Sequence, residues 1–364
     1  MSTNPYSELS PESFWRSAIV QANCASLASI YKPKWKLRKD AKIATAGSCF
    51  AQHITKRLKA QQFNVLDVEL APMGLPPDQH NKFGFSMYSA RYGNIYTARQ
   101  LCQLAEEVAG LFTPEDLVWE KDGYYYDSQR PAVEPEGLSS GEEVIEHRKY
   151  HLHRVKNMFE TMDVFIFTLG LTEGWMHHSS GTVYPVAPGV VAGSFDANQY
   201  SFHNFNSREI RQSILRFCQI VRSLRKESKA FKMLLTVSPV PLTASASGNH
   251  ILLANTYSKS CLRAVAQELR DEKSFIDYFP SYEIITNPAA RSSFYQENLR
   301  SVRQEAVDLV MDHFFSGLSI PISTDEVVVQ PTLPNAARLP ESTDSEDENI
   351  QCEEALLEAF AFQK

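Results

Sequence analysis

Short apolar segments alternate with long helical patterns along most of this chain, and this alternation restricts the fold more than any other feature. Three continuous apolar runs, at 163–169, 231–237 and 275–280, have the composition of buried parallel strands. Amphipathic helical patterns are predicted at 97–108, 142–162, 207–226, 250–269 and 302–315. Parallel strands need crossover helices of this length. The alternation therefore predicts an α/β fold, a three-layer α/β/α sandwich with a mainly parallel sheet.

The segment 42–54 contains an abrupt change of pattern. An apolar, strand-favouring run ends at Gly47, apolar residues recur at helical spacing from Phe50 onward, and a second strand-like run follows at 63–66. The turn places Ser48 at the carboxyl end of a strand and at the N-terminus of a helix. Unpaired N–H groups and the helix dipole favour negative charge at such a point. Ser48 is therefore a candidate nucleophile, although a serine at this position also serves as an ordinary helix N-cap.

Composition limits the classes of function. The 364 residues carry 36 Lys and Arg against 43 Asp and Glu, and the net charge of -7 gives no sign of a nucleic-acid surface. No apolar run reaches membrane-spanning length and the N-terminus lacks a signal-peptide pattern, so we expect a cytoplasmic protein. The six cysteines are scattered without a CxxC or Cys/His cluster. Neither a disulfide framework nor a zinc site is indicated, and we expect no metal or other cofactor.

The chain divides into three parts. Residues 1–40 are polar and contain prolines, and form an N-terminal embellishment in which 14–20 can fold as a helix against the main body. The α/β domain is expected over 41–318, with a surface insertion at about 112–141. Residues 319–364 are rich in acidic residues, which predicts a largely disordered tail. A short apolar helix at 352–362 can dock onto a protein partner or the body; a solvated tail is the alternative.

Two histidines on the predicted helix 142–162 have the spacing of a metal pair. His147 and His151 are four residues apart and share one helical face. A third ligand is missing and the HExxH pattern is absent, so solvated or core-edge histidines are the preferred interpretation.

Polar residues follow the ends of the predicted strands. Ligands of parallel sheets bind outside the carboxyl ends of the strands, so one cleft is expected to collect these residues. They are Ser48, Thr172, Glu173, Ser238, Tyr278, Ser281, Tyr282 and Glu283.

Several separated motifs together resemble the GSCFA domain family over about 40–315. These motifs are Ala46-Gly47-Ser48-Cys49-Phe50-Ala51, Tyr92-Gly93-Asn94-Ile95-Tyr96, Thr168-Leu169-Gly170-Leu171-Thr172-Glu173, Val237-Ser238-Pro239-Val240, Ser258-Lys259-Ser260 and Tyr278-Phe279-Pro280-Ser281-Tyr282-Glu283. That family is similar to the SGNH/GDSL hydrolases, which have a three-layer α/β/α fold and act as esterases or glycan O-acyltransferases. The resemblance implies a serine acyl hydrolase or O-acyltransferase whose substrate is an acyl ester, with O-acetyl groups on a glycan or a related metabolite as the expected class.

The resemblance also implies roles for single residues. Ser48 corresponds to the serine of the first block, and the backbone N–H of Ser48 or Cys49 would contribute to the oxyanion hole beside Gly47. Gly93 and Asn94 resemble the second conserved block of these hydrolases. The third block, where the wider group has Gly-x-Asn-Asp, corresponds to Gly170, Leu171, Thr172 and Glu173.

Two departures from the pattern of the wider SGNH/GDSL group bear on catalysis. Thr172 replaces the asparagine that donates to the oxyanion, and the usual Asp-x-x-His falls on Asn298-Leu299-Arg300-Ser301. A serine without a base loses several orders of magnitude in rate. A second hypothesis is therefore a non-catalytic ligand-binding or scaffold protein that keeps the fold.

Other histidines offer replacements for the missing base. His250 starts the helix after the strand 231–237 and is the preferred candidate; His177 and His178 follow Glu173, which could orient an imidazole. His53 is set aside because it points away from Ser48 on a regular helix. Structural hydrogen bonding is the alternative for each histidine, as helix or loop capping is for Glu173.

The remaining candidates each have a structural alternative. Cys49 is either a nucleophile or a small apolar packing residue. Lys259 and Arg263 are four residues apart and could bind a substrate carboxylate or phosphate. The alternative is that both lie on a solvated helix face. The residues that would line a carbohydrate site, or pack in a core instead, are Arg130, Tyr92, Tyr96 and Tyr282.

Overall fold

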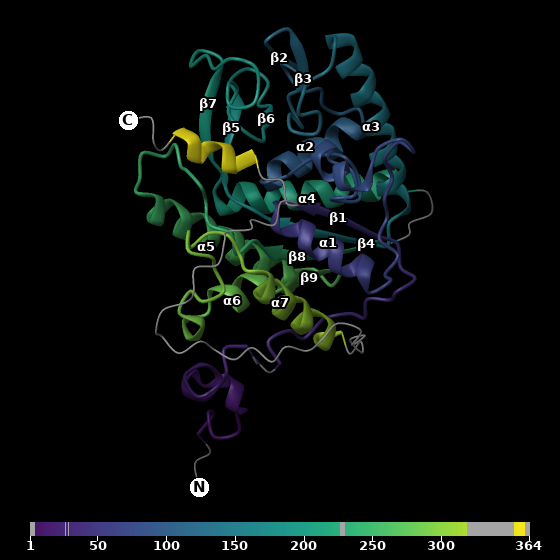
Figure 1. Cartoon of the computed structure of the whole chain (residues 1–364). Helices are drawn as coiled ribbons and strands as arrows, with labels where there is room; N and C mark the ends of the chain where they lie inside the picture. The colour runs from purple at the N-terminus through teal and green to yellow at the C-terminus, as the bar shows by residue number, and fades with distance from the viewer. Residues whose placement is uncertain (1–3, 26, 28, 226–229, 319–352, 361–364) are drawn as a thin grey trace.

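The computed structural model describes residues 4–25, 27, 29–225, 230–318 and 353–360. A parallel sheet of four strands lies at the centre of the molecule (Figure 1). In spatial order the strands are β1 (Ile43–Gly47), β4 (Val164–Leu169), β8 (Lys232–Val237) and β9 (Ile276–Phe279). Gly47 lies opposite Thr168, and Leu169 opposite Val237, so three strands end at the same edge of the sheet. The predicted α/β class with a mainly parallel sheet is confirmed.

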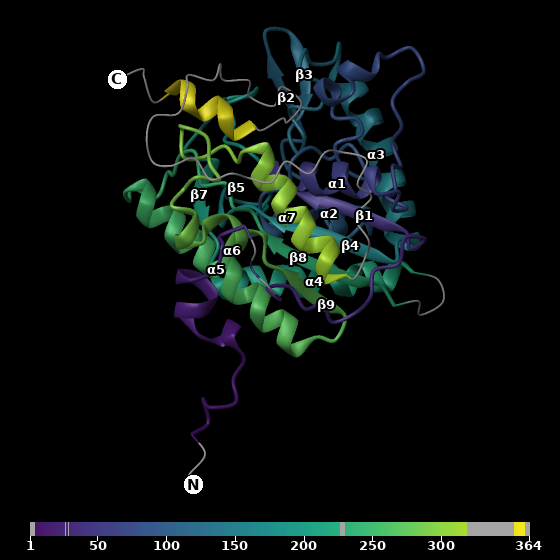
Figure 2. The same ribbon diagram turned by 60° about the horizontal axis from the view of Figure 1, so that its bottom comes forward.

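Helices cover both faces of this sheet (Figure 2). Phe165 and Phe167 of β4 face one core cluster, and Val164 and Ile166 face the other. The first cluster is completed by α2 (Ala98–Val108), α3 (Gly141–Thr161), α4 (Ser207–Leu224) and α5 (Ile251–Glu272). The second contains residues of α1 (Phe50–Ala60), α6 (Ser281–Thr286) and α7 (Gln304–Gly317). Residues that alternate along one strand thus face opposite layers, as a sheet covered on both sides requires.

Helices α2, α3 and α4 begin where the sequence supplies N-caps. Thr97 accepts a hydrogen bond from the backbone of Gln100 and forms a capping box at the start of α2. Asn206 and Glu209 form the corresponding box at α4, and Ser140 caps α3. The five helices predicted from apolar periodicity are therefore present close to their predicted positions.

Two predicted elements are present only in part. The run at 63–66 pairs in parallel with β1, but only through the isolated bridge of Val65 to Ile43, because the next hydrogen bond of that segment, from Val68, goes to the Ser89 carbonyl and not to β1.

The segment 14–20 forms a single π-helical turn at Arg16–Val20. Its Ile19 packs against the second core cluster, as predicted, whereas the Trp15 side chain is 64% exposed.

Small antiparallel sheets lie beside the central one, near the top of Figure 1. Within the predicted insertion, β2 (Val118–Lys121) and β3 (Tyr124–Asp127) form a hairpin. A second sheet has β5 (Glu173–His177) between β6 (Val183–Tyr184) and β7 (Tyr200–Asn204), and the sequence patterns did not indicate it. The two sheets share a core of aromatic side chains that includes Trp119, Tyr126, Tyr184 and Tyr200. Short 3₁₀-helices occur at Pro11–Ser13, Pro77–Gln79, Asn81–Phe83, Pro288–Ala290 and Glu353–Phe360.

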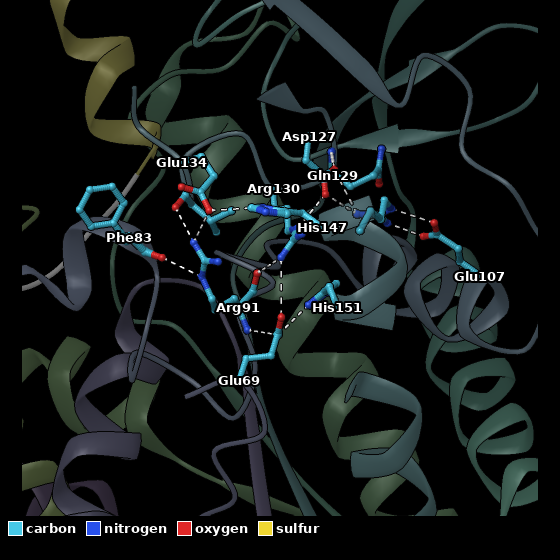
Figure 3. A network of polar contacts seen from close by, with 12 residues as sticks. Glu69, Phe83, Arg91, Glu107, Asp127, Gln129, Arg130, Glu134, His147 and His151 are labelled. Atoms are coloured by element: carbon cyan, nitrogen blue, oxygen red, sulfur yellow. Dashed lines mark hydrogen bonds and ion pairs between the residues drawn. The ribbon is translucent and has the colours of Figure 1, made fainter. Parts of the chain in front are cut away.

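A buried group of charged residues joins the β2–β3 hairpin to α2 and α3 (Figure 3). Arg148 of α3 donates to Asp127 of β3 at 3.0 and 3.1 Å and to Glu107 of α2 at 2.8 Å. Arg130 donates to the same Asp127 carboxylate at 2.7 Å. His151 of α3 bonds the buried Glu69 carboxylate at 2.7 Å. These contacts fix the insertion to the body of the protein.

The N-terminal segment is held against β9 by a buried carboxylate. Asp277, which is 0% exposed, accepts from the backbone N–H of Lys34 at 2.9 Å and from Arg270 of α5 at 3.0 Å. The Tyr31 ring packs edge-on against Phe279, with 5.1 Å between ring centroids. Part of the predicted N-terminal embellishment is thus core structure. No helix in the described ranges is long and apolar enough to cross a membrane.

Candidate functional site

A small cavity opens at the carboxyl ends of β1, β4 and β8. Its lining comes from the turn after β1, the segment before α2, the ends of β4 and β8, and α5. The lining residues are Ser48, Cys49, Tyr96, Gly170, Leu171, Ser238, Val240, Pro241, Leu242 and Lys259. The edge of the sheet that the sequence indicated therefore carries a cavity, and Ser48 and Ser238 both line it.

The Ser48 hydroxyl has an unusual environment. Ser48 is 3% exposed, and among the described residues its Oγ has no hydrogen-bond partner. Such a buried, unpaired hydroxyl typically costs about 1–3 kcal/mol, so it requires an explanation. The Ser48 N–H donates to the Thr168 carbonyl at 3.2 Å, and its carbonyl accepts from Tyr88 at 3.0 Å. The backbone of Ser48 is thus held by hydrogen bonds, whereas its hydroxyl has no hydrogen-bond partner among the described residues.

Two glycines allow this close packing. Gly47 has φ of +143°, and a Cβ there would lie 2.5 Å from the Thr168 carbonyl oxygen. A Cβ on Gly170 would lie 3.0 Å from the Ser48 Cβ and 3.1 Å from the Tyr96 carbonyl oxygen. Side chains at either position would displace the turn that carries Ser48.

Lys259 reaches the cavity from α5. The residue is 2% exposed, and its Nζ donates to the Gly170 carbonyl oxygen at 2.7 Å. The preceding residue, Ser258, accepts from the Thr172 backbone N–H at 3.0 Å, so α5 is attached at two points to the segment after β4. Arg263 lies outside the cavity lining: it donates to Glu283 and stacks over the Tyr278 ring at 4.2 Å.

Cys49 shares the cavity wall with Ser48. It is buried and immediately precedes the first residue of α1, so its backbone lies at the positive end of the helix dipole. The described cysteines form no disulfide.

The histidines proposed as replacement bases lie elsewhere. His250 is exposed and caps α5, with its Nδ1 accepting from the Leu252 backbone N–H at 3.2 Å. His177 lies on β5 with its Nε2 3.5 Å from Asp116, and His178 Nδ1 bonds the Asn198 carbonyl. No imidazole is present among the described residues that line the Ser48 cavity.

The third-block residues lie beside the cavity and are engaged in other contacts. Thr172 Oγ1 donates to Asn204 of β7 at 2.7 Å. Glu173 accepts from Ser245 at 2.8 Å, and burial raises the pKa of this carboxyl despite that hydrogen bond. The structure thus brings Gly170 into the cavity lining, but not Thr172 or Glu173.

The second-block residues and Tyr282 also lie outside the lining. The Asn94 Oδ1 accepts from Tyr88 at 2.5 Å, and Gly93 precedes it with φ of +65°. Tyr282 is half-buried and packs against the first core cluster, where burial raises the pKa of its hydroxyl.

The segment 298–301, on which the sequence resemblance places Asp-x-x-His, lies against the cavity wall. Asn298 donates to the Ser301 hydroxyl at 2.9 Å and accepts from the Ser301 backbone N–H at 2.9 Å. Arg300 Nε donates at 3.2 Å to the carbonyl of Pro241, a lining residue. The segment is therefore close to the site, but its two replaced positions bond each other.

Helix α3 places its two histidines in different surroundings. His151 is buried against Glu69, and desolvation lowers the pKa of its imidazole. His147 is half-exposed and lies 3.8 Å from Glu134. Among the described residues, no group of three or more His, Cys, Asp or Glu side chains is placed to hold a metal ion.

Sequence reasoning listed Lys259 for substrate binding but did not place it beside Ser48, and it did not identify the apolar wall 240–242. The signal for the wall was present, because Val240-Pro241-Leu242 directly follow a strand end.

Comparison with known proteins gives one family. The model described as the GSCFA family matches residues 42–314. The comparisons with curated proteins and with solved structures give no match.

Proposed function

This chain belongs to the GSCFA family, and we propose that it is a serine acyl hydrolase or O-acyltransferase with Ser48 as its nucleophile. The observation that carries the proposal is the buried Ser48 hydroxyl, which lines a cavity and has no partner among the described residues. Its position between the end of β1 and the start of α1 suits a group on which negative charge develops.

The reaction proceeds through an acyl-serine. The Ser48 Oγ attacks the acyl carbonyl carbon, the ester C–O bond breaks, and water or a hydroxyl of an acceptor then takes the acyl group. The first turn of α1, beginning beside Cys49, stabilises the tetrahedral oxyanion. The Ser48 N–H does not take part in this arrangement, since it donates to Thr168.

The cavity suits a short acyl group. The cavity volume is only about 10 Å³, and Val240, Pro241 and Leu242 supply an apolar wall. A methyl group packs well against such a wall, whereas a long chain has no enclosed path. An O-acetyl ester of a glycan or a related metabolite is therefore the substrate class we propose.

The test is the transfer of an acetyl group from a small aryl acetate. Wild-type protein should hydrolyse the ester and show an acetyl adduct on Ser48 by intact-mass and peptide analysis, and Ser48→Ala should do neither. Ser128→Ala is the matched control: Ser128 is also fully buried with an unpartnered Oγ, but does not line the cavity. Turnover that persists in Ser48→Ala contradicts the proposal.

A second function is favoured by the pairing of Asn298 with Ser301, because these positions supply no base. In that case the same cavity binds an acylated ligand without turning it over. Saturable binding of an acetylated glycan, with no adduct on Ser48 after prolonged incubation with a fluorophosphonate, identifies this function.

A further inference from the structure

Lys259 supplies the side-chain amine of the Ser48 cavity. Of the described residues that line the cavity, it is the only one with an ionisable nitrogen. It is also among the largest fully buried side chains of the protein. An enclosed lysine needs a specific reason, because burial of an ammonium group is costly.

Gly170 brings Lys259 and Ser48 together. The Gly170 carbonyl holds the Lys259 Nζ at 2.7 Å, and the Gly170 Cα is so close to Ser48 that an added Cβ would lie 3.0 Å from the Ser48 Cβ. One residue therefore contacts both the amine and the serine. Both side chains line the same cavity, and catalytic hydrogen bonds are often long before substrate binds and tighten in the complex.

Other bases are badly placed for this serine. His250 is exposed at the start of α5, and Glu173 bonds Ser245 outside the lining. Asn298 and Ser301, on which the Asp-x-x-His of the wider SGNH/GDSL group falls, bond each other. We propose that Lys259 is the general base that activates Ser48; this inference rests on the proposed acyl-transfer function.

The proton balance of this step is complete. Neutral Lys259 Nζ takes the Ser48 hydroxyl proton while Oγ bonds to the acyl carbonyl carbon. The resulting ammonium gives that proton to the departing alkoxide as the ester C–O bond breaks. In the second half-reaction Nζ takes a proton from water or an acceptor hydroxyl, and returns it to Ser48 Oγ as the acyl–serine bond breaks.

The surroundings of Lys259 suit this role. Leu171, Val240 and Leu242 form the apolar part of the lining, and removal of water is the means by which proteins favour the neutral amine of a catalytic lysine.

The experiment measures the second-order rate of Ser48 modification by an aryl fluorophosphonate between pH 6 and pH 10. We compare wild-type protein with Lys259→Met, Lys259→Arg and the control Lys232→Met, a half-buried lysine at the start of β8. A general base contributes about 100- to 10,000-fold, so Lys259→Met should lose at least about 100-fold. Lys259→Arg should not recover the rate, because a guanidinium does not accept the proton.

The pH profile separates a base from a cation that only stabilises charge. With Lys259 as base, the wild-type rate rises with pH through one ionisation, and this ionisation is missing in both Lys259 variants. A wild-type rate that is constant or falls between pH 6 and pH 10 overturns the assignment. This measurement needs no variant, so it decides the question even where Lys259→Met does not fold, as checked by thermal unfolding.

The outcomes distinguish the base from the function on which it rests. Wild-type modification at Ser48 together with a Lys259→Met rate within threefold of wild type overturns the base alone. Absence of any Ser48 adduct in wild-type protein, with the aryl acetate also unhydrolysed, overturns acyl transfer and with it the role of Lys259.

Discussion

The buried contact between α3 and the β2–β3 hairpin provides a quantitative test of what holds this fold together. Arg148 is the residue to change, because it binds two carboxylates from two other elements, Asp127 of β3 and Glu107 of α2. The side chains of Arg148, Asp127 and Glu107 are 4%, 6% and 9% exposed. Substitution by Met keeps most of the apolar stem and removes only the charge and the donors.

The magnitude follows from what remains after the substitution. Glu107 loses its two bonds from Arg148, while Asp127 keeps the Arg130 Nε at 2.7 Å and the Gln129 N–H at 3.0 Å. Removal of one partner from a buried ion pair typically costs about 3–5 kcal/mol, because a charge is left without compensation. We therefore expect Arg148→Met to lower the free energy of unfolding by about 3–5 kcal/mol at pH 7.

The pH dependence has a defined sign. Burial alone would raise the pKa of Asp127, but the charges of Arg148 and Arg130 outweigh it and hold that pKa at about 2. The pKa of Asp127 in the folded protein is thus below its unfolded value, and the stabilisation is present above about pH 4 and lost as the pH falls towards 2. Arg148→Met raises the pKa of Asp127 in the folded state, so the difference in stability between variant and wild type should shrink from pH 7 to pH 3.

The assay is urea unfolding followed by circular dichroism at pH 7 and pH 3. The control is Lys149→Met, the next residue on α3, whose ion pair with Glu146 is solvent-exposed and should contribute less than about 1 kcal/mol. A loss for Arg148→Met below about 1 kcal/mol, equal to that of Lys149→Met, refutes the account of the network given above.

Two further predictions concern stability. Gly47→Ala should lower the free energy of unfolding in urea by at least about 2 kcal/mol, because φ is +143° and the new Cβ would lie 2.5 Å from the Thr168 carbonyl oxygen. The control is Gly74→Ala, whose Cβ meets no atom within 4 Å and which should change that free energy by less than about 0.5 kcal/mol. Equal losses in the two variants contradict the reasoning. Burial raises the pKa of Glu69 but His151 and other partners lower it to about 2, below the ordinary value, so its stabilisation is lost as the pH falls from about 4.5 to 2. Glu69→Gln should therefore be less stable at pH 7 and lose less stability than wild type between pH 5 and pH 3; parallel unfolding curves against pH would exclude this role.

The central sheet could be predicted from sequence because its strands are buried on both faces. All residues of β4 except Thr168 are apolar, and a helix with an N-cap at Asn206 separates this run from the next such run. The β5–β7 sheet escaped prediction for the opposite reason. Trp175 of β5 pairs with Phe202 of β7, and His177 pairs with Tyr200; such cross-strand contacts are encoded by no local pattern.

The candidate site also has one part that the local sequence predicts and one part that depends on tertiary packing. The position of Ser48 follows from a local change of pattern, strand to turn to helix, and needs no knowledge of the rest of the chain. Lys259 lies more than 200 residues later, and its spacing to Arg263 indicates only a shared helix face. The packing of α5 against the segment after β4 then sends one of these two cations into the cavity and the other to Glu283. Contacts of this kind depend on the assembled layers.

The bond between Asp277 and the backbone of Lys34 has a consequence for how the chain assembles. The two residues are 243 positions apart, so closing the loop between them costs roughly 5 kcal/mol of chain entropy. At ordinary rates of synthesis, about 12 to 50 s pass before the second partner follows the first out of the ribosome. During that time Tyr31 and its apolar neighbours have no β9 to pack against. The N-terminal segment is thus among the first parts of the described chain to be made and among the last to be covered, and the newly made protein is most prone to aggregate until Phe279 has emerged.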